Sequence, residues 1–283
     1  MRVATITACV LVSTVRVEIG AADGPSTGPQ ERTISVPDGV SLVLVRIPSG
    51  SFQMGSPDTE RSRRRDEGPV HTVSIAYDFY LGKYEVTQAQ WMALMGSWPG
   101  RAPSSGYGMG GSYPAYHVSW NDAKNFITAL NVHVMATGQG PLTVRLPSEA
   151  EWEYACRAST QTRFSFGDSL AVADVCQDDE MRSQCMWYCG NDGAKPVGMK
   201  LANTFGLYDM HGNVWEWCED WYHSSYSRAP ADGDAWASPT ASYRVIRGGS
   251  WNSFAGGCRS ADRNSCMPTS RPDYVGFRLA AVE

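Results

Sequence analysis

The first regular pattern along the chain is an alternation of apolar and polar positions that begins near Val40. The segment VSLVLVRIPSGSFQMGS, residues 40–56, alternates as strands do and breaks at Pro-Ser-Gly, which predicts a hairpin. The segment HTVSIAYDFYLGKYEV, residues 71–86, is dominated by β-branched and aromatic residues, which predicts a further strand. The first third of the chain is therefore expected to build a sheet.

Helical periodicity appears in three later segments, each preceded by a capping signal. A small hydroxyl residue stands three positions before a side chain that can bond back to it, in the pairs Thr87 with Gln90, Ser119 with Asp122, and Ser148 with Glu151. These signals predict helices over about Gln88 to Met95, Trp120 to Val134 and Glu149 to Ala158. From Arg163 onward, short apolar pieces alternate with Gly, Asn, Asp and Pro, which predicts loops and no long helix.

Composition agrees with one globular unit of mixed α and β elements. The 283 residues are 42% hydrophobic and include 10 Trp and 13 Tyr, which suffices for a core, while 28 Gly and 16 Pro indicate many turns. The formal charge is only −5, and the one dense basic run, residues 61–65, is followed at once by acids. Nucleic acid is therefore not expected as a partner.

The N-terminus has a charged start and an apolar run from Val3 to Val15, as secretory signals do. Arg16 and Glu18 interrupt this run, which is too short to span a bilayer. We predict a signal peptide over residues 1–22, a polar linker over 23–39 and a folded domain over 40–283. The predicted location is periplasmic or secreted, without a transmembrane segment.

Export makes disulfides possible, but the number of cysteines is odd once Cys9 leaves with the signal peptide. Seven then remain: Cys156, Cys176, Cys185, Cys189, Cys218, Cys258 and Cys266. At least one thiol must stay free or pair between chains, and spacing alone does not give the pairings. Cys185 and Cys189 are expected to hold their own loop, with Cys176 as a possible partner.

Several segments resemble one family when they are taken in order. They are IPSGSFQMGS, YEVTQAQW, VSWNDAKNF, RLPSEAEWEYACRA, NTFGLYDMHGNVWEWCEDWY, RVIRGGSW and VGFRLA. This order is similar to that of the sulfatase-modifying factor family, whose founding member is the formylglycine-generating enzyme. The resemblance covers Val40 to Glu283. It implies a single compact α+β domain with little regular secondary structure, related to the C-type lectin fold.

The founding enzyme binds copper(I) with two cysteines that follow its GGS and oxidises a substrate cysteine with oxygen. Copper(I) is soft and prefers sulfur ligands. Counted from GGS in this sequence, Ser253 stands at the first catalytic cysteine. Counted back from CRSADR, Cys258 matches a structural cysteine that pairs with Cys156 in EYAC, and the second catalytic cysteine has no counterpart. The resemblance thus implies a Cys156–Cys258 disulfide and no copper, unless a rearranged loop brings Cys266 close to Cys258.

The same resemblance implies a calcium site in YDMHGNVWEW. Its ligands would be the side chains of Asp209 and Glu216 and the backbone carbonyls of Gly212 and Val214. Calcium is a hard cation that accepts such oxygens in flexible geometry. The alternative is that Asp209 and Glu216 cap turns and pair with an arginine. A second family site would fall near Asn191 and Asp192, where the spacing departs from the pattern.

Function is predicted from the stretch between Trp251 and Tyr274, which lines a surface cleft in the family. Its small, polar and aromatic residues suit the recognition of a peptide or a small polar ligand on a rigid frame. The expected contacts are Trp251, Asn252, Ser253, Phe254, Arg259 and Tyr274. We predict an exported ligand-binding member of the family that does not use copper. The alternative is an extracytoplasmic oxidase that acts on a peptide or a siderophore precursor.

Overall fold

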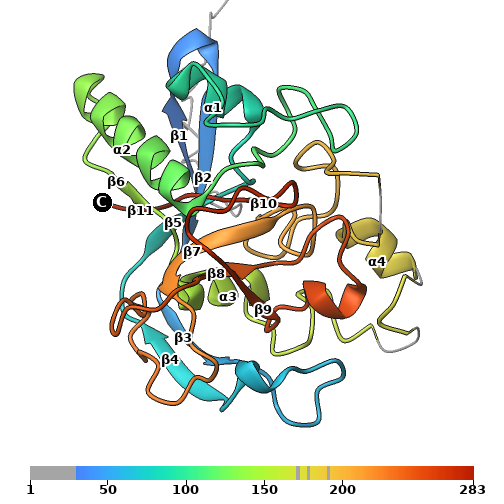
Figure 1. The fold of residues 1–283 in the computed structure, drawn as a ribbon. Helices are drawn as coiled ribbons and strands as arrows, with labels where there is room; N and C mark the ends of the chain where they lie inside the picture. Colours follow the sequence, from blue (N-terminus) through green and yellow to red (C-terminus); the bar gives the residue numbers. More distant parts are fainter. Residues whose placement is uncertain (1–29, 170–172, 177–178, 190–191) are drawn as a thin grey trace, which may run out of the picture.

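The largest sheet of the protein has five strands and receives the C-terminal strand inside it (Figure 1). The computed structural model describes residues 30–169, 173–176, 179–189 and 192–283. The spatial order of this sheet is β1 (Glu31–Ser35), β2 (Ser41–Ile47), β5 (Phe79–Gly82), β11 (Ala280–Val282) and β6 (Thr143–Arg145). All neighbouring pairs are antiparallel, and the last residues of the chain therefore complete the sheet.

Two smaller sheets complete the β structure. One has the order β10 (Val275–Gly276), β7 (Trp215–Trp221), β8 (Arg244–Arg247) and β9 (Arg263–Cys266), with only β10 and β7 parallel. The other pairs β3 (Gly50–Met54) with β4 (His71–Ile75). The predicted hairpin at Pro-Ser-Gly is wrong, because β2 pairs with β1 and β5 whereas β3 pairs with β4. Asp78 Oδ1 accepts a hydrogen bond from Ser49 N (2.7 Å) at the bend where the chain changes sheets.

The three predicted helices are confirmed together with their caps. They are α1 (Gln88–Met95), α2 (Trp120–Ala136) and α3 (Glu149–Arg157), and each begins with the predicted capping box. Among the described residues after Arg163, the helical elements are the short α4 (Glu180–Cys185) and the 3-10 turn η3 (Ala255–Cys258). Two further 3-10 turns are η1 (Pro37–Gly39) and η2 (Arg65–Glu67). No helix within the described ranges is long and apolar enough to cross a bilayer.

The five-stranded sheet separates two hydrophobic clusters, because successive side chains of a strand point to opposite faces. On β2, Leu42 and Leu44 join the cluster that contains α1 and α2. Val45 and Ile47 join the cluster that contains α3 and the β3–β4 pair. Figure 1 shows α1 and α2 on one side of this sheet and β3 and β4 at the opposite end of the molecule.

The predicted boundary between linker and domain needs correction. β1 lies inside the segment 23–39 that was expected to be a linker, and all five of its residues pair with β2. Its Ile34 is buried in the cluster with α1 and α2, so β1 belongs to the folded domain and the boundary lies before residue 40. The predicted signal peptide lies outside the described residues. The predicted α+β architecture with little regular structure is confirmed.

Candidate ligand-binding cleft

The turn after β8 is held by its own polar side chains. Ser250 N and Ser250 Oγ both lie 3.1 Å from Ser253 Oγ, and Ser250 Oγ donates to Asn252 Oδ1 (2.7 Å). Gly249 has a positive φ of 76°, and a Cβ at this position would collide with the sulfur of Cys258. The GGS sequence is therefore needed to fold this turn tightly against η3.

This turn forms one wall of a surface cleft of about 400 Å³. The other walls come from the loop before η2, from the loop before α4 and from β7. The described lining residues are Ser62, Arg64, Asp174, Trp215, Asn252, Ser253, Phe254, Gly256, Gly257 and Asp262. We call this space the Ser253 cleft. Segments that lie far apart in sequence therefore meet around Ser253, the residue that the GGS motif indicated.

Three of the six predicted contact residues line this cleft, and the other three lie elsewhere. Asn252, Ser253 and Phe254 are part of the lining, and the Phe254 side chain is 63% exposed. Trp251 instead packs against Tyr107, with ring centroids 5.9 Å apart. Tyr274 packs against the hydrophobic cluster of α1 and α2. Adjacent residues point in different directions here, so the motif alone did not separate cleft from core.

Arg259 has a different role from the predicted one. Its side chain has no exposed surface, and its guanidinium donates to Glu67 Oε1 (2.6 Å) and to Glu60 Oε1 (2.5 Å). It also donates to Ser62 O (2.8 Å). Arg259 therefore lies under the cleft and holds the 56–67 loop in place, and the prediction that it contacts a ligand is corrected.

The two carboxyl groups of the cleft are in different electrostatic environments. Burial raises the pKa of Asp262 to about 7, although Arg259 lies 3.4 Å away and opposes the shift. Burial also acts on Asp174, but hydrogen bonds from Ser62 and Arg163 outweigh it and lower the pKa of Asp174. At neutral pH, Asp174 is therefore ionised, and its hydrogen-bond donors balance its negative charge. Asp262 is partly protonated at the same pH.

Comparison of the sequence with known protein families shows the family of this chain. The family model described as the sulfatase-modifying factor enzyme 1-like domain matches residues 30–282. The chain belongs to the sulfatase-modifying factor family. The match begins at the first strand of the five-stranded sheet, in agreement with the corrected domain boundary.

Three proteins that are similar to this chain over most of its length carry different names. The formylglycine-generating enzyme of Thermomonospora curvata is 30% identical, over 92% of this chain and 97% of its own length. The structure of PvdO from Pseudomonas aeruginosa is 33% identical, with a TM-score of 0.75 over 89% of this chain and 98% of that one. Treponema denticola variable protein 1 is 29% identical, with a TM-score of 0.71 over 89% and 99%. The predicted family and fold are thus confirmed.

The cysteines of this family member are not paired as the resemblance implied. Cys156 and Cys258 are both buried and unbonded, and the imidazole of His211 contacts both residues. Its Nδ1 bonds to Cys258 O (2.9 Å), and its Nε2 lies 3.9 Å from the sulfur of Cys156. The expected Cys156–Cys258 disulfide is therefore corrected. The bond in the structure joins Cys176 to Cys189, and Cys185 stays unpaired.

The thiols of Cys156 and Cys258 are buried in the core. Burial raises the pKa of Cys156 to about 12 and raises that of Cys258 well above its usual range. Both groups are therefore in the thiol form at neutral pH. None of the described residues that line the Ser253 cleft is a cysteine. Cys266 lies on β9 and packs against the cluster of α1 and α2, away from Cys258 in the core.

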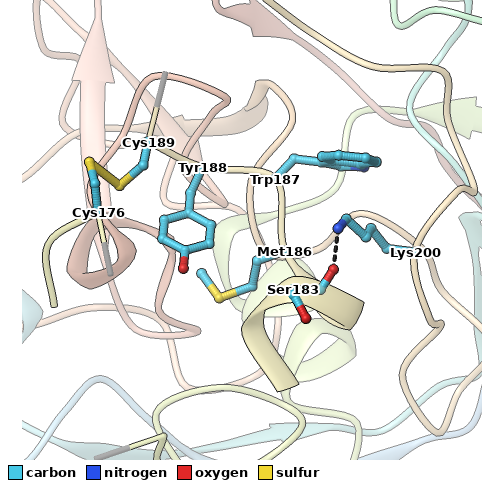
Figure 2. A pocket seen from close by; sticks show the side chains of 7 residues that line it. All are labelled: Cys176, Ser183, Met186, Trp187, Tyr188, Cys189 and Lys200. Carbon is cyan, nitrogen blue, oxygen red and sulfur yellow. Dashed lines mark hydrogen bonds between the residues drawn. A yellow bond between two sulfur atoms is a disulfide. The ribbon is translucent and has the colours of Figure 1, made fainter. Parts of the chain in front are cut away.

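The Cys176–Cys189 disulfide connects two supports of the cleft turn. Cys189 N donates to Ser253 O (2.8 Å), and Gly256 N donates to Asp174 O (3.4 Å), two residues before Cys176. Figure 2 shows the disulfide on the wall of a neighbouring pocket of about 210 Å³. The Lys200 ammonium lies in this pocket 4.0 Å from the ring centroid of Trp187. The disulfide thus fixes the positions of both segments behind the Ser253 turn.

Replacing Cys176 and Cys189 together by serine is expected to loosen the cleft turn. Closing a loop of 13 residues contributes about 2–3 kcal/mol in the chain-entropy account. Urea unfolding should show this loss, and amide hydrogen exchange should become faster at residues 253–257. Cys185→Ser is the matched control and should leave both readouts unchanged. Unaltered exchange in the double variant would show that the disulfide does not support the cleft.

Most carboxylate oxygens of the predicted calcium ligands Asp209 and Glu216 already accept hydrogen bonds from other residues. Both carboxylate oxygens of Glu216 accept hydrogen bonds from Arg278 at 2.6 Å, and Oε2 also accepts one from Trp152 Nε1 (2.7 Å). Asp209 Oδ2 accepts a hydrogen bond from Gly198 N (2.7 Å), whereas its Oδ1 makes no hydrogen bond of good geometry with the described residues, although the Trp187 side chain interacts with this carboxyl group. Glu216 thus follows the alternative prediction of pairing with an arginine, and Asp209 keeps one oxygen available to a cation.

A further carboxylate, which the sequence did not indicate, lies near Asp209. Glu85 is 1% exposed, and neither of its carboxylate oxygens has a hydrogen-bond partner among the described residues. A hydrogen bond from Tyr208 N to Lys83 O (3.0 Å) brings the two segments together. Burial, followed by the charge of Asp209, raises the pKa of Glu85. The oxygens suited to a hard cation are therefore on Asp209 and Glu85.

The described side chains do not form a further metal-binding cluster. Within the described ranges, no three His, Cys, Asp or Glu side chains are placed to hold a metal ion. A cation at Asp209 would therefore also need backbone carbonyls, such as those predicted at Gly212 and Val214. Asn191 lies outside the described residues.

Proposed function

We propose that this protein is an exported member of the family that binds a peptide or small polar ligand in the Ser253 cleft without copper-thiolate oxidation. The observation that carries the proposal is the lining of the cleft. Ser253 is part of this lining, no described lining residue is a cysteine, and an exposed aromatic side chain borders the cleft. A hydroxyl is a poor substitute for a thiolate as a copper(I) ligand.

Features around the cleft support recognition. A volume of about 400 Å³ is within the range of small-ligand sites. Phe254 offers an exposed ring, while Asn252 and Asp262 offer polar groups, which together resemble the anchors of binding sites. The disulfide between Cys176 and Cys189 supports export, because such bonds persist in oxidising compartments.

Calcium is part of this proposal as a structural ion. Oxygens of Asp209 and Glu85 would hold it together with the carbonyls of Gly212 and Val214. Glu216 would orient Arg278 instead of binding the ion. The ion would supply positive charge beside two buried carboxyl groups, of which Glu85 has no hydrogen-bond partner among the described residues.

Peptide binding to the cleft is testable with a positional-scanning library of acetylated tetrapeptide amides, followed by NMR of the ¹⁵N-labelled protein. Amide shifts should cluster at residues 252–257. Phe254→Ser should weaken binding about tenfold or more, since an aromatic anchor contributes more than 1 kcal/mol. Met267→Ser is the control, because Met267 is 51% exposed but outside the cleft lining. Shifts that avoid the cleft would contradict the proposal.

A second candidate is an extracytoplasmic oxidase of the same family that acts on a peptide or a siderophore precursor. Asp262 favours it, because a buried carboxyl with a pKa of about 7 beside a cleft is suited to accept a proton. Oxygen uptake with cysteine-containing peptides and copper(I) distinguishes the two functions. The binding proposal expects no uptake. Oxygen uptake by the parent protein that is lost in Cys258→Ser or Cys266→Ser would show that the protein is an oxidase and would overturn the binding proposal.

A further inference from the structure

The Ser253 cleft contains a cationic group that is not tightly paired. Arg64 is the only arginine or lysine among its described lining residues. Its side chain is 49% exposed, and its Nε lies 3.7 Å from Asp66 Oδ1, which is longer than a hydrogen bond. Asp66 itself accepts a hydrogen bond from Tyr222 through its other oxygen (2.6 Å). The Arg64 guanidinium therefore has donors available for a ligand.

The negative groups of the same cleft are already compensated. Asp174 accepts hydrogen bonds from Ser62 Oγ (2.6 Å) and from Arg182 (2.9 Å), and it is also paired with Arg163. Asp262 is 4% exposed and lies beside Arg259. The uncompensated charge that reaches solvent in this cleft is consequently positive.

An apolar surface accompanies this charge. Phe254 is 63% exposed and lines the cleft from the 252–257 turn, whereas Arg64 lines the same cleft from the 56–67 loop. An exposed ring beside an available guanidinium offers two different anchors on the two walls of one cleft. A ligand that uses both must combine an apolar ring with an anion.

We infer that the Ser253 cleft selects a peptide in which a carboxylate stands next to an aromatic side chain. The carboxylate binds the guanidinium of Arg64, whose planar fork matches two carboxylate oxygens. The aromatic side chain packs against Phe254. This inference rests on the proposed function and specifies its ligand. The carboxylate belongs either to an acidic side chain or to the C-terminus of the peptide.

A pH dependence accompanies this recognition. The charged groups that act on Asp262 are Arg259, Glu67, Arg64 and Arg247. As the pH rises through about 7, Asp262 loses its proton and adds negative charge to the cleft wall. An acidic peptide should therefore bind more weakly at pH 8 than at pH 6, whereas a neutral peptide should not follow this trend.

The test compares three probes by NMR titration of the full-length protein with its disulfide intact. They are acetyl-Gly-Asp-Phe-Gly-amide, its Asn counterpart, and acetyl-Gly-Gly-Phe with a free C-terminus. At least one carboxylate probe should bind about tenfold more tightly than the Asn probe, as expected for a charge-assisted hydrogen bond. Arg64→Gln should abolish this preference. Arg65→Gln is the matched control, since Arg65 lines a different pocket on the same loop.

The outcomes separate the inference from the function on which it rests. Equal affinity for the Asp, Asn and free-acid probes at the cleft overturns the charge selection and leaves peptide binding standing. A carboxylate preference that survives in Arg64→Gln also overturns the inference. If the library and all three probes leave residues 252–257 unshifted, the proposed function itself fails. Comparison of the two carboxylate probes tells which source of the anion is recognised.

Discussion

Replacing Glu149 by glutamine is expected to cost about 3–5 kcal/mol of unfolding free energy, because it leaves the buried Arg263 without its paired carboxylate, whereas Arg247 keeps its pair with Glu153 (2.6 Å). Glu149 begins α3 and accepts two hydrogen bonds from Arg263, at 2.8 and 2.6 Å. It also accepts hydrogen bonds from Tyr226 (3.0 Å) and Arg247 (3.3 Å). Arg247 and Arg263 have no exposed side-chain surface. One carboxylate thus connects α3 to β8 and β9.

Urea unfolding at pH 7 measures this effect. Glu219→Gln is the control, because its pair with Lys124 is partly exposed, at 27% and 34%, and should contribute less than about 1 kcal/mol. If Glu149→Gln does not fold, the double variant Glu149→Gln/Arg263→Met should recover folded protein, since it also removes the charge that the single variant leaves unpaired. A loss below about 1 kcal/mol in the single variant would mean that water or another group replaces Glu149.

Calcium is expected to raise the melting temperature of chelator-treated protein by about 5–10 °C at saturating concentration. An ion that binds only the folded state contributes about 2.7 kcal/mol at a hundred times its Kd, and such a change shifts Tm by several degrees in a domain of this size. Scanning calorimetry with calcium and with EDTA measures the shift. Identical melts would remove the ion from the proposal.

The Glu85→Gln variant tests whether Glu85 coordinates the calcium ion. Because Glu85 has no hydrogen-bond partner in the described part of the chain, its amide should fold normally yet lose the calcium response. Glu31→Gln, an exposed partner of Lys83, should respond like the parent protein. A full calcium response in Glu85→Gln would exclude Glu85 as a ligand and return the site to Asp209 and Glu216.

The candidate cleft was only half visible in the sequence. Asn252 to Phe254 were predicted because they follow a recognisable GGS motif. Ser62 and Arg64 lay in a basic run whose composition indicated only that nucleic acid is not bound, and Asp174 carried no local signal. These residues reach the cleft through contacts such as Arg259 with Glu67, which are 192 positions apart. No local pattern encodes such a pairing.

The sequence by itself determined the starts of the three helices, the family and the lack of a paired thiol motif after GGS. Capping acts between residues three positions apart, and a motif is a property of neighbouring residues, so both can be read locally. Only the tertiary structure decided which strands pair, that Cys176 bonds Cys189 while His211 contacts both Cys156 and Cys258, and that Arg259 is buried. These outcomes depend on distances between remote segments, which burial of the whole core sets and no short stretch contains.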